Sequence, residues 1–218
     1  MATDEPPGEA VSGEPTRRLF FALWPDEAMR EAMAEAIRGA ARAWRGSDPV
    51  CGGRPVPARN LHVTLAFLGS VPERRRSKLA EVARGAAETA SSALATASSP
   101  GNPLELVFDH LEHWRAARAL CALPAEPPAP VAALARQLQD LLVGRGFAPD
   151  LKPFRPHVTV VRKVVSPGPI GKMHPVVWQF AELALIESRT LPEGALYSVV
   201  ESYPLWSGIN AANNSQTP

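Results

Sequence analysis

"PARNLHVTLAFLGS", at residues 57–70, sets His62 and Thr64 two positions apart inside an apolar run. The same tripeptide, His-Val-Thr, returns in "FRPHVTVVRK" at residues 154–163. Both runs are rich in Val, Leu and Phe and are bounded by Gly or Pro, so we expect each to form a β-strand. Because each strand follows a stretch with helical spacing, the repeated tripeptide suggests two related lobes.

The repeated tripeptide brings together side chains suited to acid–base chemistry. Residues i and i+2 of a strand point to the same face, so His62 projects with Thr64, and His157 with Thr159. If the two strands meet, one imidazole can accept a proton while the other donates one, since imidazole titrates near neutral pH. The hydroxyls can donate hydrogen bonds to a phosphoryl group. A lone His on a strand is usually structural, but its duplication in the same context favours function.

Basic side chains gather around the second copy, at Lys152, Arg155, Arg162 and Lys163. They suit phosphate binding, although solvated strand ends would have the same composition. Arg162 lies five residues after His157, so strict alternation would point it away from the cleft. A strand end or a β-bulge there would turn it back.

Aromatic and histidine residues elsewhere allow two interpretations each. Phe20, Phe21 and Phe154 could stack on a nucleobase, but most phenylalanines of this kind belong to a core. His110 and His113 lie three apart beside acidic residues and could hold a metal, but no third ligand with suitable spacing follows. We therefore expect a solvated strand face there and no metal site.

Composition indicates one globular domain. Of the 218 residues 45% are hydrophobic and 21% charged, and a net charge of +1 gives no overall attraction to nucleic acid. Cys51 and Cys121 show no metal-ligand spacing and are expected to be separate thiols. The acidic, Pro/Gly-rich residues 1–16 are unlike a signal peptide, which leads us to expect a cytoplasmic location. We predict a disordered tail at 1–16, a bilobal domain at 17–208 and a flexible tail at 209–218.

The remaining pattern predicts an α+β fold with mostly antiparallel sheets. Gly69 is expected to end the strand of the first motif, and His174 is expected in a loop. Strands are predicted at 17–24, 61–68, 104–114, 117–124, 157–164, 180–188 and 196–205, helices at 25–44, 72–90 and 130–146, a loop at 46–60 and a linker at 91–103.

Four stretches together resemble one known family. They are "RLFFALWP", "LHVTLAFLG", "FRPHVTVVRK" and "ESRTLPEGALYSVVESYPL", and the resemblance spans about residues 18–206. The chain resembles the 2H phosphoesterase superfamily, which is named for two His-x-Thr motifs. Within it, the bacterial RNA 2′,3′-cyclic phosphodiesterase family, also called 2′-5′ RNA ligase, is the best match.

This resemblance implies two pseudo-symmetric lobes, each a mostly antiparallel sheet with helices on its outer side, and an active-site cleft between them. It implies hydrolysis of a terminal 2′,3′-cyclic phosphate to a 2′-phosphomonoester without a metal or other cofactor. By motif position, His62 would donate a proton to the leaving 3′ oxygen and His157 would activate water. Thr64 and Thr159 would hold the phosphoryl oxygens, and Arg162 would contact phosphate.

Other functions stay open at the level of sequence. The same residues could run the reaction backward as a 2′-5′ RNA ligase, or act on a smaller cyclic nucleotide. From a different class comes a nucleotide- or RNA-binding module without turnover. For the substrate we expect RNA ends or nucleotides that carry a 2′,3′-cyclic phosphate, with Phe20, Phe154 and Arg155 as further contacts. We expect a monomer that does not bind a membrane.

Overall fold

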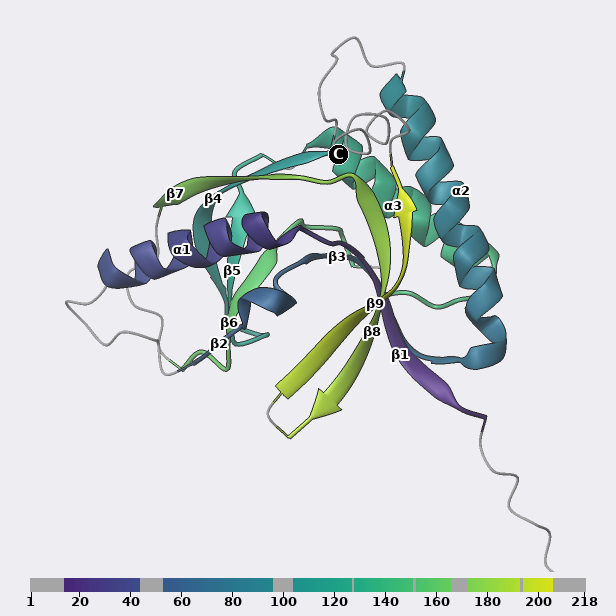
Figure 1. Cartoon of the computed structure of the whole chain (residues 1–218), viewed down its shortest axis with the longest axis horizontal. Helices are drawn as coiled ribbons and strands as arrows, with labels where there is room; N and C mark the ends of the chain where they lie inside the picture. The colour runs from purple at the N-terminus through teal and green to yellow at the C-terminus, as the bar shows by residue number, and fades with distance from the viewer. Residues whose placement is uncertain are drawn as a thin grey trace, which may run out of the picture.

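The fold was analysed in a computed structural model of the chain (Figure 1). The predicted tails at 1–16 and 209–218 lie outside the described residues, except that Glu14 and Pro15 lead into the first strand. The carbonyl of Pro15 accepts a hydrogen bond from the amide of Glu73 at 3.1 Å. The structure describes residues 14–43, 53–95, 104–126, 128–150, 152–165, 172–192 and 194–205.

Strands dominate the described chain, and three α-helices pack against them (Figure 1). The strands are β1 (Thr16–Leu23), β2 (Arg54–Pro55), β3 (Val63–Pro72), β4 (Glu105–Trp114), β5 (Ala119–Pro124), β6 (Val158–Arg162), β7 (Lys172–Gln179), β8 (Glu182–Leu191) and β9 (Gly194–Pro204). The helices are α1 (Glu27–Ala43), α2 (Arg76–Ala95) and α3 (Ala129–Gly144), with 3-10 turns η1 (Ala58–Asn60) and η2 (Glu73–Arg75).

Two antiparallel sheets form the lobes, which confirms the predicted α+β class. Sheet A has the strand order β3-β1-β8-β9, and sheet B has the order β2-β6-β5-β4-β7. The first His-x-Thr motif belongs to sheet A and the second to sheet B. Each motif therefore lies in its own lobe, as the repeated tripeptide suggested.

The helices connect the two lobes. Helix α1 follows β1 of sheet A but packs along β7 of sheet B, where the indole Nε1 of Trp178 donates to the carbonyl of Met29 at 2.9 Å. Helix α3 follows β5 of sheet B and packs against α2 and β3. Figure 1 shows α2 and α3 at one side of the molecule and α1 across sheet B. Each sheet thus receives a helix from the other lobe, which holds the lobes together.

The predicted helices at 72–90 and 130–146 each bury one apolar face. Leu79, Val82 and Ala86 of α2 are fully buried, as are Val131 and Leu138 of α3. These side chains join one hydrophobic cluster that takes in residues of both sheets. Burial of this apolar surface is the main force that holds the fold together. Within the described residues, no helix combines the length and apolar character needed to span a membrane.

Gly69 does not end the strand of the first motif, contrary to the prediction. Strand β3 continues to Pro72, and Gly69 has a φ of 68°, which favours glycine. The register against β1 shifts at this point, so that Leu68 has no partner opposite. Gly69 therefore marks a β-bulge within the strand.

Strand β7 was not predicted, and His174 lies in it rather than in a loop. The strand contains Pro175, which has no amide hydrogen to donate to a neighbour. This is tolerated because β7 is the edge strand of sheet B and the register against β4 is irregular around Pro175.

Two shorter deviations concern loops. The predicted loop at 46–60 contains strand β2 and turn η1, and its residues 46–52 lie outside the described chain. The predicted linker at 91–103 begins with the last turn of α2, which runs to Ala95, while its residues 96–103 are not described. Strand β2 is only two residues long, so it shows no periodicity in the sequence.

Candidate active site

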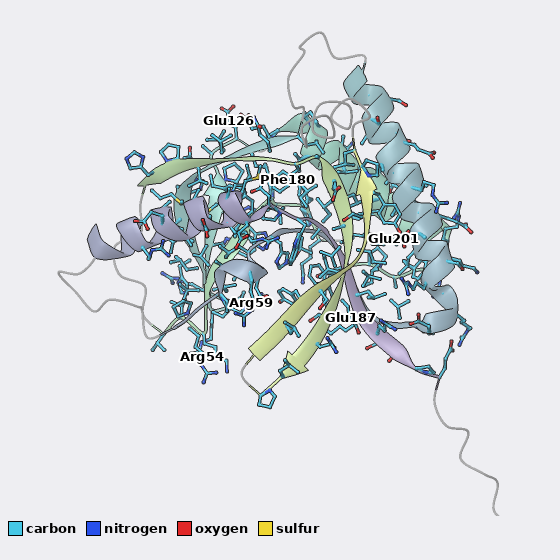
Figure 2. All side chains as sticks on the ribbon, viewed as in Figure 1. Arg54, Arg59, Glu126, Phe180, Glu187 and Glu201 are labelled. Carbon is cyan, nitrogen blue, oxygen red and sulfur yellow. The ribbon has the colours of Figure 1, made fainter. Side chains whose placement is uncertain are left out.

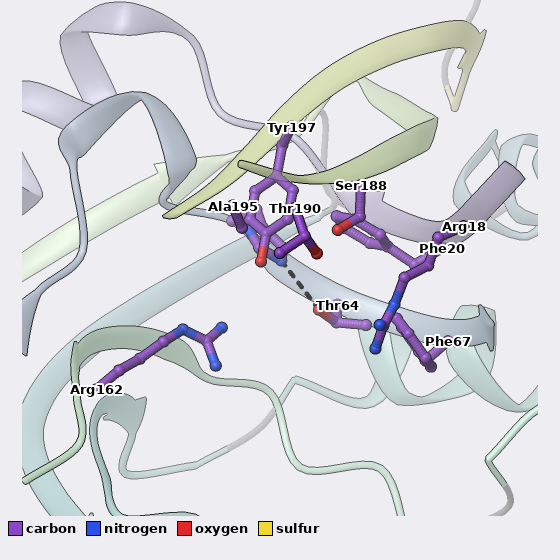
Figure 3. Close-up of a pocket in the computed structure, with 10 residues that line it drawn as sticks. Arg18, Phe20, Thr64, Phe67, Arg162, Ser188, Thr190, Ala195 and Tyr197 are labelled. Carbon is purple, nitrogen blue, oxygen red and sulfur yellow. Dashed lines mark hydrogen bonds between the residues drawn. The ribbon is translucent and has the colours of Figure 1, made fainter. Parts of the chain in front are cut away.

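The first motif lines a cavity of about 420 Å³, called here the His62 cavity. His62 comes directly before β3, and Thr64 is its second residue, so both side chains face the same side, as predicted. Figure 3 shows Arg162 across this cavity from Tyr197, with a hydrogen bond that reaches Thr64. Arg18, Phe67, Ser188 and Thr190 complete the polar and aromatic wall.

Aromatic rings enclose the imidazole of His62. Its ring centroid lies 5.0 Å from that of Phe20, 5.7 Å from Trp24 and 5.2 Å from Tyr197. Burial among these rings lowers the pKa of His62 to about 4, and the positive charge of Arg162 acts in the same direction. His62 is therefore neutral in the free protein near neutral pH.

Hydrogen bonds fix the orientation of this ring. Nδ1 of His62 lies 2.7 Å from the carbonyl oxygen of Asn60, which can only accept, so Nδ1 carries the hydrogen. Nε2 lies 3.1 Å from Oγ1 of Thr64 and faces the cavity. The side-chain amide of Asn60 donates to the carbonyl of Ala195 at 2.8 Å. Asn60, which the sequence analysis missed, thus ties the first histidine to strand β9.

The second motif repeats this arrangement. Nδ1 of His157 donates to the carbonyl of Arg155 at 2.8 Å, again two residues earlier in the chain. The ring centroid of His157 lies 4.2 Å from that of Trp114. Burial lowers the pKa of His157, and the charges of Arg155 and Arg162 add to the effect. In both motifs the Nε2 atom is left for chemistry.

The two histidines face adjoining cavities. His157 lines a cavity of about 760 Å³, called the His157 cavity, and this cavity shares Thr64 and Phe67 with the His62 cavity. Thr64 therefore lies where the two spaces meet. Thr159 lines neither of them, and its Oγ1 lies 4.0 Å from Sγ of Cys121. His62 and His157 thus line separate cavities that meet at Thr64, and the charge of His157 contributes to the lowered pKa of His62.

A β-bulge turns Arg162 toward the site. Opposite the consecutive residues Leu120 and Cys121 of β5 lie Val161 and Thr159, so Val160 is an extra residue in β6. Val160 and Val161 are both buried, and the next side chain, Arg162, is exposed and lines the His62 cavity. The bulge that the sequence analysis considered is present, and it resolves the doubt about alternation.

The other predicted substrate contacts have different surroundings. Phe20 is only 3% exposed and its ring packs against those of His62 and Tyr197, so it supports the imidazole of His62. Phe154 is half-buried in the wall of the His157 cavity, together with Phe67.

Arg155 is engaged with a carboxylate. Its guanidinium makes two hydrogen bonds to Glu112, at 3.3 and 2.8 Å, and lies 5.3 Å from the ring centroid of Trp114. The hydrogen bond from Arg155 also lowers the pKa of Glu112. The Arg155 side chain therefore braces β4 against the segment that carries His157.

Several residues of the site escaped the sequence analysis. Arg18 lies with its guanidinium carbon 5.1 Å from the ring centroid of Phe67, at the mouth of the His62 cavity. Arg18 is two positions before Phe20 on β1, so the period-2 rule could have placed it on the same face. Tyr197 and Trp114 could not have been found this way, because strands far away in sequence supply them.

The histidine pair at His110 and His113 shows no sign of metal coordination. Nδ1 of His110 lies 2.8 Å from Oδ1 of Asp109, and His113 lines the His157 cavity. Across the described ranges, no three His, Cys, Asp or Glu side chains converge as a metal site would require.

Comparison with known proteins decides the family. The family model described as the 2′-5′ RNA ligase superfamily matches residues 25–190, which include both motifs. The chain belongs to this superfamily. A relative in Escherichia coli K12, named RNA 2′,3′-cyclic phosphodiesterase, is 31% identical over 147 residues, covering 67% of this chain and 72% of the relative. A relative of the same name in Thermus thermophilus is 29% identical over 210 residues, covering 92% and 96%.

Solved structures of this superfamily share the two-lobed fold. A phosphoesterase crystal structure matches with a TM-score of 0.70 and 26% identity, covering 88% of this chain and 99% of that one. The structure of E. coli LigT complexed with 3′-AMP matches with a TM-score of 0.68 and 25% identity, with the same coverage. That ligand is a nucleotide with a phosphate on its ribose.

Proposed function

We propose that this protein hydrolyses the terminal 2′,3′-cyclic phosphate of RNA to a 2′-phosphomonoester by two-histidine acid–base catalysis. The observation that carries the proposal is that His62 and His157 line two adjoining cavities that share Thr64. The names of the relatives in E. coli and T. thermophilus support the same reaction.

In the proposed reaction, Nε2 of His157 takes a proton from water, and the water oxygen forms the new bond to phosphorus. The bond from phosphorus to the 3′ oxygen breaks, and Nε2 of His62 gives its proton to that oxygen. The assignment of donor and acceptor follows the family resemblance. In both rings the backbone hydrogen bond engages Nδ1, so Nε2 is the nitrogen that can exchange a proton with the substrate or water. These bonds do not distinguish the donor from the acceptor.

His62 must carry a proton before the 3′ oxygen leaves. Its pKa of about 4 makes the imidazolium more acidic than an ordinary one, but leaves it scarcely populated in the free protein at neutral pH. The negative charge of a bound cyclic phosphate raises the pKa, because an adjacent anion stabilises imidazolium. Substrate binding and protonation of His62 are thus coupled in the proposed mechanism.

Charge that builds on the non-bridging oxygens needs donors. Thr64 lies where the cavities meet and can donate its hydroxyl hydrogen, whereas Thr159, its counterpart in the second motif, lines neither cavity. Arg162 projects into the His62 cavity and suits a planar, charge-assisted contact with phosphate. These groups, with the two imidazoles, supply every proton and charge that the reaction requires.

The test is incubation with a nucleoside 2′,3′-cyclic phosphate in the presence of EDTA, followed by identification of the product isomer. We expect turnover with the 2′-phosphomonoester as product. Formation of the 3′ isomer would contradict the assignment of the leaving group. Retained binding with no hydrolysis would instead identify a nucleotide- or RNA-binding module.

Ligation is the second candidate, because the matching family model is described by that activity. The reverse reaction would use the same residues, with a 5′-hydroxyl in place of water. Incubation of a cyclic-ended RNA with a 5′-hydroxyl RNA separates the two activities. Since water is far more concentrated than any RNA end, we expect hydrolysis to dominate.

A further inference from the structure

A third cavity, of about 270 Å³, opens beside the His62 cavity and is lined by four cationic side chains. Arg54 and Arg59 come from β2 and η1, and Arg162 and Lys163 come from the end of β6. Figure 2 shows Arg54 and Arg59 at the margin of sheet B that lies toward the β8–β9 hairpin. We call this space the cationic cavity.

The cations of this cavity have no acidic partners. Among the residues that the structure describes, no carboxylate lines the cavity or forms an ion pair with its arginines or its lysine. In the His157 cavity, by contrast, Arg155 pairs with Glu112 and Lys152 pairs with Asp150. The cationic cavity therefore gathers four cations with no carboxylate in its lining, whereas the lining of the His157 cavity includes both Glu112 and Asp150.

The backbone brings these like charges together. Arg54 lies directly opposite Arg162 in the antiparallel pairing of β2 with β6, an arrangement that repulsion disfavours unless an anion is present. Gly53 allows the close approach, since a Cβ atom there would lie 2.6 Å from Cγ1 of Val161. Lys163 has a φ of 58°, in the left-handed region that costs energy for a residue with a side chain. Such costs are found where a ligand compensates for them.

The cationic cavity continues directly into the candidate active site. It shares Arg162, Ala195 and Tyr197 with the His62 cavity. Arg162 therefore lies between the reacting phosphate and any anion bound beside Arg54 and Arg59. A ligand that fills both spaces must carry a second negative group close to its cyclic phosphate.

We propose that the cationic cavity is a second phosphate site, which binds the phosphate on the 5′ oxygen of the terminal nucleoside. This inference rests on the proposed function. A nucleoside with a 2′,3′-cyclic phosphate can continue only through its 5′ oxygen, and in RNA that oxygen carries the next phosphate. The site thus selects oligoribonucleotides, and 5′-phosphorylated nucleotides, over simple nucleoside 2′,3′-cyclic phosphates.

The test compares kcat/KM for three substrates that end in the same 2′,3′-cyclic phosphate. They are a nucleoside, its 5′-phosphorylated form and a short oligoribonucleotide. We expect the two substrates with a 5′ phosphate to exceed the nucleoside by about tenfold or more, which is typical of charge-assisted contacts. In Arg54→Ala/Arg59→Ala this preference should fall to within about threefold. For the oligoribonucleotide, the slope of log(kcat/KM) against log salt concentration should also become shallower in this double variant. The change in slope should correspond to the loss of about one to two phosphate contacts.

Matched variants separate a specific site from a general loss of charge. Arg84→Ala/Arg189→Ala removes the same charge from α2 and from β8 outside the cationic cavity, and it should keep the preference. Arg54→Lys/Arg59→Lys should keep part of the preference for substrates with a 5′ phosphate. Equal kcat/KM for all three substrates, or an equal loss with the control variant, would overturn the second phosphate site but leave hydrolysis intact. Absence of hydrolysis of any substrate would instead overturn the proposed function.

Discussion

The two His-x-Thr motifs hold their histidines by the same backbone contact but have different surroundings. In each, Nδ1 of the histidine donates to the carbonyl two residues earlier. His62, however, is packed by three aromatic rings, from Phe20, Trp24 and Tyr197, whereas one ring, that of Trp114, contacts His157. The local backbone therefore fixes the orientation of each imidazole ring. Side chains from distant strands determine how deeply each ring is enclosed.

The different surroundings affect the pKa values of His62 and His157, although the two histidines have the same sequence motif. Burial lowers the pKa of both rings, and for His62 it does so to about 4. A pair of like groups can divide acid and base duties when their environments push the pKa values apart. The more enclosed ring holds its proton more weakly, so the donor role that the family resemblance gives to His62 requires that the bound phosphate anion raise the pKa of His62.

The largest effect should come from removing either imidazole. We expect His62→Ala and His157→Ala each to lower kcat for a nucleoside 2′,3′-cyclic phosphate by at least ~10²-fold. The double variant should be close to the worse single variant, because the two groups act on one phosphorus as a unit. His174→Ala on β7, an exposed histidine, serves as the control. Full activity in either single variant would show that the imidazole removed in that variant is not required for hydrolysis.

Acid should destabilise the protein through the first motif in particular. The pKa of His62 falls from 6.5 to about 4 on folding, so between these values the unfolded chain binds a proton that the folded chain does not. Unfolding free energy should therefore fall by up to ~3 kcal/mol as the pH drops from 6.5 to 4, at about 1.4 kcal/mol per pH unit. Urea unfolding at several pH values measures this.

Two variants isolate that contribution to acid sensitivity. His62→Gln should remove most of the ~3 kcal/mol difference, and His157→Gln should remove less, because fewer aromatic rings enclose His157. A loss of stability between pH 6.5 and 4 that is the same in His62→Gln as in the parent would show that the first imidazole is not the group that resists protonation.

The smallest effects concern the residues that brace each ring. Asn60 donates from inside the protein to Ala195, while Arg155 pairs with Glu112 near the surface. Loss of a buried hydrogen bond costs more than loss of an exposed ion pair. We expect Asn60→Ala to lower unfolding free energy by ~1–3 kcal/mol, and Glu112→Gln to change it by less than ~1 kcal/mol.

A kinetic measurement distinguishes positioning by Asn60 from a purely structural role. In Asn60→Ala, kcat for a nucleoside 2′,3′-cyclic phosphate should fall about tenfold through misplacement of His62. KM for this substrate should change little, since Asn60 lines neither histidine cavity and the substrate has no 5′ phosphate for the cationic cavity, which Asn60 does line. An Asn60→Ala variant that is destabilised but retains the parent kcat would contradict this function of the side chain.

Much of the fold could be predicted because most elements carry a clear period. The apolar faces of α2 and α3 repeat with helical spacing, and β8 contains a continuous apolar run, Leu183–Ile186, that is buried. Strand β7 could not be predicted, because Pro175 interrupts its pattern and only its pairing with β4 defines it. Gly69 was misread as a strand end because a bulge and a stop have the same local signal.

The site was predictable only where the chemistry is local. The doubled motif predicts His62, Thr64, His157 and Thr159 as site residues, of which the first three line the two adjoining cavities. Asn60 and Tyr197 act through contacts between segments far apart, such as the bond from Asn60 to Ala195 on β9. Long-range register between strands fixes those contacts, and a single sequence does not record it.

The order of strands in sheet A also has a consequence for synthesis of the chain. Strand β1 lies between β3 and β8, and Leu19 is opposite Glu187. Strand β1 therefore cannot complete its pairing until β8, near the end of the described chain, has been synthesised. The wall around His62 needs Tyr197, from β9. A chain still on the ribosome therefore holds both histidines long before it can bury the first, and sheet A closes only when nearly all the described residues have been translated.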